Sequence, residues 1–331
     1  MLQTSGLEQA VPAVLCNVTS QLVPATAADR LHLITSQTHR NNFVQLQDAE
    51  KRLEALTEYL KVWRAVYRCG LTGQPSSTAP IVFVWKDLCG IGGRFDAYAS
   101  PAMQYEHAMC CVAAAMLHVT LVRDTVKANP KNTISRLQAA HALVGEAEFT
   151  MNNWQASSLT KAGLPLILQA ESLQGLKEYI TGWYGVAFAL CASSKQLFKA
   201  ESECWNFSQQ HFSKAVLGTV PAEKWNAAME ALQKQSAVMC ALSLAQLASI
   251  THQADGNKPP VGQALAALKS VQMHGYHSEL VDGAVERLTR DNNSIYFQMV
   301  TLGTLENIEL PALQVYNNAL SDASSVTLRL I

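Results

Sequence analysis

The sequence of 331 residues predicts an all-α protein of elongated shape with a few short strands. Its eleven prolines are separated by long intervals rich in alanine, leucine, glutamine, glutamate, lysine and methionine, all of them strong helix formers. Alternating runs of β-branched residues, which indicate sheets, are rare. We therefore expect strands only at Ile81–Trp85 and within residues 1–30.

The predicted helices are supported by the spacing of their apolar residues. Between residues 46 and 69, large apolar side chains recur every three or four positions, which places them on one face of a helix. Ser100 and Pro101 are typical of a helix start, so a helix is expected from there to about Lys127. Further helices are predicted at 133–160, at 165–210 with an alternative break near Gly182 or Gly185, at 221–251 and from 261 onward.

The helices also suggest how the chain is organised. The segment 219–272 reads as helix, turn and helix, with small residues where the two helices approach. This pattern is similar to the helix pairs of superhelical repeat proteins, although the sequence contains no strict internal repeat.

Composition and charge exclude several classes of protein. Apolar residues make up 49% of the chain and charged residues 15%, which is typical of a globular protein and not of a disordered one. The formal net charge of −1 creates no overall field that would attract nucleic acid, so no nucleic-acid partner is expected. Because no uninterrupted apolar run reaches the roughly 18 residues of a membrane span, we expect a cytoplasmic protein.

The stretch Ile81–Asp96, read as IVFVWKDLCGIGGRFD, places a glycine-rich loop after an apolar strand candidate. A P-loop requires Gly-Lys-Ser/Thr, whereas Arg94–Asp96 follow the glycines here. A dinucleotide site requires Gly-x-Gly-x-x-Gly at the start of a helix within a βαβ unit, and neither the spacing nor the context is present. We therefore interpret the loop as a connection between a short strand and a helix.

Other chemistry-bearing residues form no recognisable site. His107 and His118 lie eleven residues apart and His274 and His277 lie three apart, but neither pair belongs to a zinc-protease signature. A catalytic pair of cysteine and histidine that meets only in space stays open as an alternative. No catalytic residue, cofactor or metal is expected. Four cysteines in apolar helical runs are interpreted as reduced core thiols, namely Cys110, Cys111, Cys191 and Cys240.

Several stretches, in their order and spacing, resemble the Bro1 domain. The segments VFVWKD and MQYEHAMCC are similar to the family's apolar strand with Trp-x-Asp and to its helix that opens Tyr-Glu-Lys; here Trp85 and Asp87 match, and His107 replaces the lysine. Residues 46–66 and 167–180 resemble two of the family's helices. Near the end, a motif with Asp-Asn-x-x-Ile-Tyr-x-x-x-Val is matched by Asp291, Asn292, Ile295, Tyr296 and Val300.

The resemblance implies a banana-shaped domain with a tetratricopeptide-like helical core at 40–320, preceded by a weakly matched segment 1–39 packed on it and followed by a tail at 321–331. It implies a non-catalytic scaffold of endosomal sorting, recruited from the cytoplasm to endosomes. The implied partner is the C-terminal amphipathic helix of an ESCRT-III subunit of the Snf7/CHMP4 type. A peripheral contact with the endosomal membrane stays open.

The resemblance also implies an apolar groove for this partner helix. The positions that match the family's groove are Gln174, Ala187 and Cys191, and a one-residue shift of the match gives Val186 and Leu190 instead. The neighbours Leu173 and Ile180 and the later Tyr296 complete the candidate groove. Some of these are smaller or more polar than the large apolar residues common in the family, which motivates an alternative. In that alternative the chain is a divergent adaptor that has lost ESCRT-III binding and binds a small GTPase or a signalling protein. Core packing is the other explanation for the apolar residues at helical spacing.

Overall fold

The computed structural model describes residues 18–21, 43, 45–68, 82–86, 94–98, 100–126, 128–152, 166–215, 223–251, 259–303, 305 and 308–313. In chain order the elements are β1 (Val18–Gln21), α2 (Ala49–Arg68), β2 (Val82–Lys86), β3 (Arg94–Tyr98), α3 (Ser100–Thr125), α4 (Pro130–Asn152), a 3-10 turn (Leu166–Leu168), α5 (Ala170–Ser194), α6 (Phe198–Lys214), α7 (Glu223–Thr251), α8 (Val261–Met273), α9 (Glu279–Asp291) and a π-helical turn (Asn292–Tyr296).

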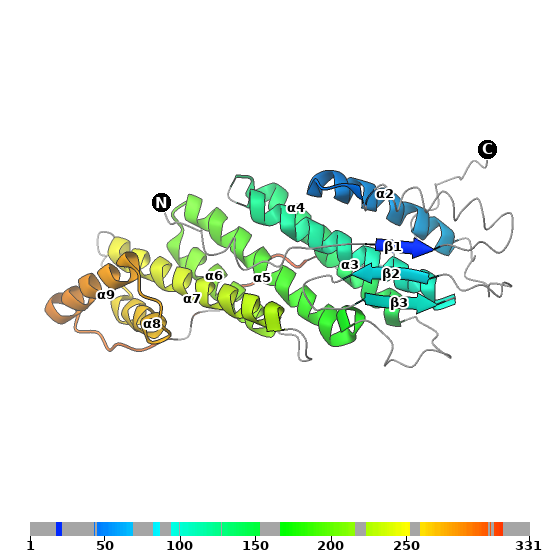
Figure 1. Ribbon diagram of the computed structural model, residues 1–331. Coiled ribbons are helices and arrows are strands. Elements are labelled where there is room, and N and C mark those ends of the chain that lie inside the picture. Colours follow the sequence, from blue (N-terminus) through cyan, green and yellow to red (C-terminus); the bar gives the residue numbers. More distant parts are fainter. Residues whose placement is uncertain are drawn as a thin grey trace.

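The helices form an extended row (Figure 1). Each helix from α3 to α8 packs against the next one in sequence, and α7 also contacts α9. The small sheet and α2 lie at one end of the row, and α8 and α9 lie at the other. The predicted all-α, elongated architecture with a few short strands is confirmed.

The three strands form an antiparallel sheet in the order β1-β2-β3, in which Trp85 is opposite Val18 on one side and Phe95 on the other. The strands predicted at Ile81–Trp85 and within residues 1–30 correspond to β2 and β1. Strand β3 was not predicted, because the glycines before it favoured a loop and its strand character comes from pairing with β2. The glycine loop, Asp87, most of segment 1–39 and the tail 321–331 lie outside the described residues.

The single helix predicted at 165–210 is wrong, because the chain forms α5 and α6 with a turn between them. Gln196 in this turn has φ 58°, a left-handed conformation, and the Leu197 amide donates back to the Ala192 carbonyl at 3.0 Å. Helix α5 continues through its glycines. A Cβ atom at Gly182 would lie 2.5 Å from the Phe212 ring, so glycine is needed there for the close approach of α6.

Helix α3 lies in the centre of the core, because every residue from Tyr105 to Leu117 is buried. Its stretch Tyr105–Arg123 is long and apolar enough to cross a membrane, but 83% of it is buried inside the protein. Burial among the neighbouring helices α2 and α4 therefore accounts for its apolar composition.

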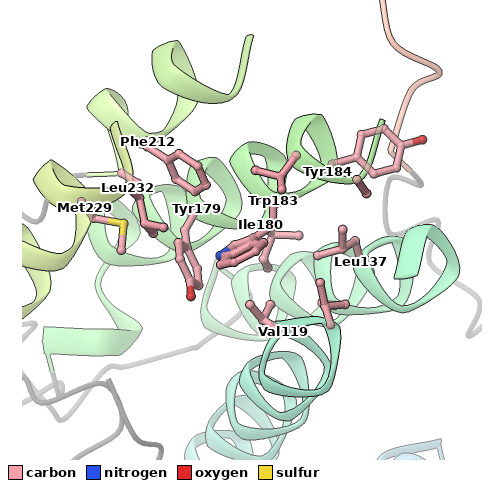
Figure 2. Close-up of a cluster of buried hydrophobic side chains, with 14 of the residues drawn as sticks. Val119, Leu137, Tyr179, Ile180, Trp183, Tyr184, Phe212, Met229 and Leu232 are labelled. Carbon is pink, nitrogen blue, oxygen red and sulfur yellow. The ribbon is translucent and has the colours of Figure 1, made fainter. Parts of the chain in front are cut away.

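Aromatic and aliphatic side chains from α3, α4, α5, α6 and α7 pack together in the core (Figure 2). Tyr179 and Trp183 on α5 pack against Phe212 of α6, with ring centroids 6.2 and 6.3 Å apart. Tyr179 also meets the Trp225 ring of α7 edge-on at 5.0 Å. Figure 2 shows Val119 and Leu137, from α3 and α4, on the other side of Trp183. The cluster fixes α5 between its neighbours.

Candidate functional site

The structure divides the candidate groove residues into two groups. Leu173, Ile180, Val186 and Ala187 are each at most 1% exposed, so their side chains lie in the core and offer no surface to a partner. The physical reason is that α5 is covered by α4 on one side and α6 on the other, which leaves little of its circumference open. For these four residues, core packing accounts for the helical spacing of the apolar positions.

The other candidate residues keep some exposed surface, but Gln174 lies near the opposite end of α5 from Leu190 and Cys191. Gln174 is exposed and donates its amide hydrogen to Glu178 Oε1 at 2.9 Å. Leu190 and Cys191 are half-buried near the C-terminal end of α5, about 24 Å further along the helix at 1.5 Å per residue. Tyr296, also half-buried, belongs to the turn after α9.

Near the junction of α5 and α6, Leu190 and Cys191 are half-buried and Leu197 is exposed, and we call these three residues the α5–α6 surface. Leu197, in the turn between the helices, is 54% exposed. Burial raises the pKa of the Cys191 thiol, although the nearby charge of Lys195 lowers it in part. The thiol is therefore neutral at physiological pH and adds to the apolar character of the surface.

The motif near the end of the chain has a structural role at Asn292. Its side-chain oxygen accepts the Gln298 amide hydrogen at 2.9 Å, and its side-chain nitrogen donates to the Gln298 carbonyl at 3.0 Å. Gln298 in turn accepts from the Gly262 amide at 2.9 Å, which ties this segment to the start of α8. Asn292 is buried, and these bonds satisfy its polar atoms.

A second feature is a buried polar cluster between α2, α3 and α4, formed by Arg64, His107, Cys111, Glu146 and Thr150. The Arg64 Nε group donates to Glu146 Oε1 at 2.7 Å, and its Nη2 group donates to the other oxygen. His107 Nε2 lies 2.9 Å from Glu146 Oε1, and its Nδ1 lies 3.2 Å from Thr150 Oγ1. Sequence reasoning missed this cluster, because its members lie up to 86 residues apart and meet only through helix packing.

The electrostatics of the cluster keep its carboxylate charged. Burial raises the pKa of Glu146, but hydrogen bonds from His107 and Arg64, together with the Arg64 charge, outweigh burial and lower this pKa to about 2. The pKa of the Cys111 thiol is raised well above its usual value by burial and by the negative charge of Glu146.

The histidine pairs considered from the sequence do not act together among the described residues. His107 belongs to the buried cluster, whereas His118 lies near Arg136 and Glu50. His274 Nδ1 lies 2.7 Å from the Ser270 carbonyl oxygen, and His277 Nδ1 lies 3.3 Å from Asp282 Oδ1, both at the exposed surface.

We expect His118→Gln to flatten the dependence of stability on pH between about pH 6.5 and 4. Burial, and to a lesser extent the Arg136 charge, lower the pKa of His118 from 6.5 to about 4, although the Glu50 charge raises it in part. In this window the unfolded chain binds a proton that the folded protein does not bind. Stability therefore falls as the pH drops from 6.5 to 4, by up to about 3 kcal/mol, and this fall stops below pH 4.

The measurement is urea unfolding followed by circular dichroism at half-unit pH steps. The exposed His274 is the matched control, and His274→Gln should retain the wild-type pH dependence. An unchanged slope in His118→Gln would contradict the assignment.

Comparison with known proteins gives matches in structure alone. No family model and no curated protein matches the sequence. The solved structure titled "ALIX BRO1 CHMP4C complex" superposes with a TM-score of 0.67 at 16% identity, over 92% of this chain and 95% of that one. A structure titled "Structure basis for endosomal targeting by the Bro1 domain" gives 0.63 at 15% identity, over 94% and 95% of the two chains.

A third solved structure is longer than this chain. It is titled "Crystal Structure of ALIX in complex with the SIVmac239 PYKEVTEDL Late Domain" and superposes with a TM-score of 0.64 at 14% identity. The match covers 92% of this chain and 50% of that chain. At these identities the likeness concerns the fold.

Proposed function

We propose that this chain, which has the fold of a Bro1 domain, is a non-catalytic protein-binding scaffold of the ESCRT and endosomal sorting pathway. Its partner is the C-terminal amphipathic helix of an ESCRT-III subunit of the Snf7/CHMP4 type. The observation that carries the proposal is the match over nearly the whole chain to a Bro1 domain whose structure is titled as a complex with CHMP4C.

The α5–α6 surface has the chemistry that such a partner requires. An amphipathic helix presents apolar residues at i, i+3, i+4 and i+7, and it docks on an apolar surface with a polar rim. Leu190, Cys191 and Leu197 supply the apolar part. Ser194 and Lys195, both exposed beside them, supply polar groups at its edge.

The proposal also includes where in the cell the chain acts. The chain acts in the cytoplasm and is recruited to endosomes, as supported by the neighbour whose title describes endosomal targeting by the Bro1 domain. A direct contact with the endosomal membrane is a separate proposal, for which a vesicle sedimentation assay with the purified chain is the test.

We expect Leu190→Asp to weaken binding of the Snf7/CHMP4-type C-terminal peptide by at least about tenfold, because a carboxylate would lose its hydration on the apolar surface. Cys191→Asp should act in the same way. Binding is measured by titration of the labelled peptide followed by fluorescence anisotropy, and the fold of each variant is checked by its thermal unfolding curve.

Ile250→Asp is the matched control, because Ile250 is also apolar and is 48% exposed, at the end of α7. This variant should bind the peptide as the wild type does. Equal binding by Leu190→Asp and wild type would show that the partner contacts a different surface.

The alternative is a divergent adaptor that binds a small GTPase or a signalling protein. The specific observation in its favour is that Ala187 is buried and Cys191 is small and half-buried, so the matched positions offer little apolar area. A correctly folded chain that fails to bind the peptide at high micromolar concentration would favour this alternative over ESCRT-III binding.

A further inference from the structure

The buried polar cluster brings together three side chains of the types that bind zinc. His107 and Cys111 are four residues apart on α3, so they share one face of that helix. Glu146 on α4 faces them, and one ligand atom from each of the three residues lies within 4.8 Å of the other two. All three residues are buried.

The spacing of these atoms suits a small ion. With zinc bonds of about 2.0–2.3 Å to nitrogen, oxygen and sulfur, ligand atoms around a tetrahedral ion lie about 3.3–3.6 Å apart. The 2.9 Å between His107 Nε2 and Glu146 Oε1 is slightly shorter than this, and the upper limit of 4.8 Å is longer. Changes of up to about 1.5 Å, which side-chain rotation can supply, would bring the three atoms to ligand distances.

Hydrogen bonding fixes the His107 imidazole with Nδ1 toward Thr150 and Nε2 toward Glu146, an orientation that suits zinc binding by Nε2. The Thr150 hydroxyl donates its one hydrogen to the Glu146 carbonyl at 2.8 Å, so Thr150 Oγ1 can only accept from His107 Nδ1. The hydrogen on Nδ1 leaves Nε2 as the atom that faces Cys111 and Glu146. A histidine ligand of zinc typically donates its other ring N–H to an oxygen in this way.

The positive charge of Arg64 beside Glu146 repels a cation, but zinc binding also releases protons, which offsets this repulsion. Zinc binding displaces two hydrogens, that of the Cys111 thiol and the one that His107 Nε2 donates to Glu146, and a coordinating thiol is deprotonated. One divalent ion in exchange for two protons leaves the charge of the cluster unchanged. The Arg64 side chain is 33% exposed whereas that of Glu146 is 5% exposed, so movement of Arg64 would give the ion access from the solvent.

We propose that His107, Cys111 and Glu146 bind one zinc ion that joins α3 to α4. Three protein ligands leave the fourth position to a water molecule. Because both helices belong to the core, the ion stabilises the folded chain. This site does not depend on the proposed ESCRT function, since it lies in the core and not on the α5–α6 surface.

Cobalt titration of the full chain, after treatment with a chelator, tests the site. One cobalt ion per chain should produce a thiolate-to-cobalt charge-transfer band in the near ultraviolet, and one equivalent of zinc should abolish it. Zinc should also raise the Tm of the wild type. Cys111→Ser should lose the band and the zinc-dependent rise in Tm, and His107→Ala should weaken binding by at least about tenfold.

Cys110→Ser is the matched control, because Cys110 is the adjacent residue, is equally buried on α3 and lies outside the three ligands. It should keep the cobalt band. Absence of the band from the wild type at one equivalent of cobalt would overturn the proposal, even if Cys111→Ser failed to fold. A band that persists in folded Cys111→Ser would also overturn it, because the metal would then be bound elsewhere.

Discussion

Replacement of Trp183 by alanine is expected to lower the free energy of unfolding by about 3–5 kcal/mol. Trp183 is 1% exposed and lies where α5 meets α3, α4 and α6, so its removal leaves a large cavity that the surrounding helices cannot fill (Figure 2). It also removes the edge-to-face contact with Phe212. Urea unfolding followed by far-ultraviolet circular dichroism measures the loss.

Trp183→Phe separates the effect of ring packing from the effect of the polar indole nitrogen at the same position. The indole Nε1 is buried and has no hydrogen-bond partner in the described part of the chain, so phenylalanine removes an unsatisfied donor and keeps most of the ring contacts. We expect this variant to lose clearly less stability than Trp183→Ala. Equal losses in the two variants would contradict the view that packing accounts for the contribution of Trp183.

The second large effect is expected at Glu146. Glu146→Ala should lower the free energy of unfolding by about 3 kcal/mol, because it leaves the half-buried Arg64 and the buried His107 without their acceptor. This value is at the lower end of the range for buried ion pairs, since the Arg64 side chain remains 33% exposed and water can solvate it. Unfolding in chelator-treated buffer measures the loss without any contribution from bound metal.

Glu148→Ala is the matched control on the same helix. Glu148 also forms an ion pair, with Lys177, but its side chain is 33% exposed whereas that of Glu146 is 5% exposed. Both partners of the Glu148 pair keep contact with water, which reduces what such a pair contributes, so Glu148→Ala should cost clearly less stability than Glu146→Ala. Equal losses of stability in the two variants would show that burial does not explain the effect of replacing Glu146.

The sequence was sufficient to predict the helices whose signals are local. The helix start at Ser100 and Pro101 and the apolar face of α2 were both expected, because capping residues and helical spacing act within a few residues. The turn between α5 and α6 was not expected, because Gln196 is neither glycine nor proline and adopts its left-handed conformation only within the packed helix pair.

Contacts between distant residues limited what the sequence could indicate about sites. The spacing of Leu173, Ile180 and Ala187 is the same for a core face as for a binding face, and only the positions of α4 and α6 distinguish the two. In the same way, Arg64 and Glu146 carry no local sign that they meet. The fold was nevertheless accessible through the resemblance, which uses the order of several motifs along the chain.

The order of the helices along the row affects where the chain begins to unfold. Because each helix from α3 to α8 rests mainly on its immediate neighbours, stability is distributed through nearest-neighbour coupling along the row. Local unfolding can then begin at the end formed by α8 and α9, where the helices are short, while the long buried helix α3 stays folded. The two ends of the row are therefore expected to differ in how cooperatively they unfold.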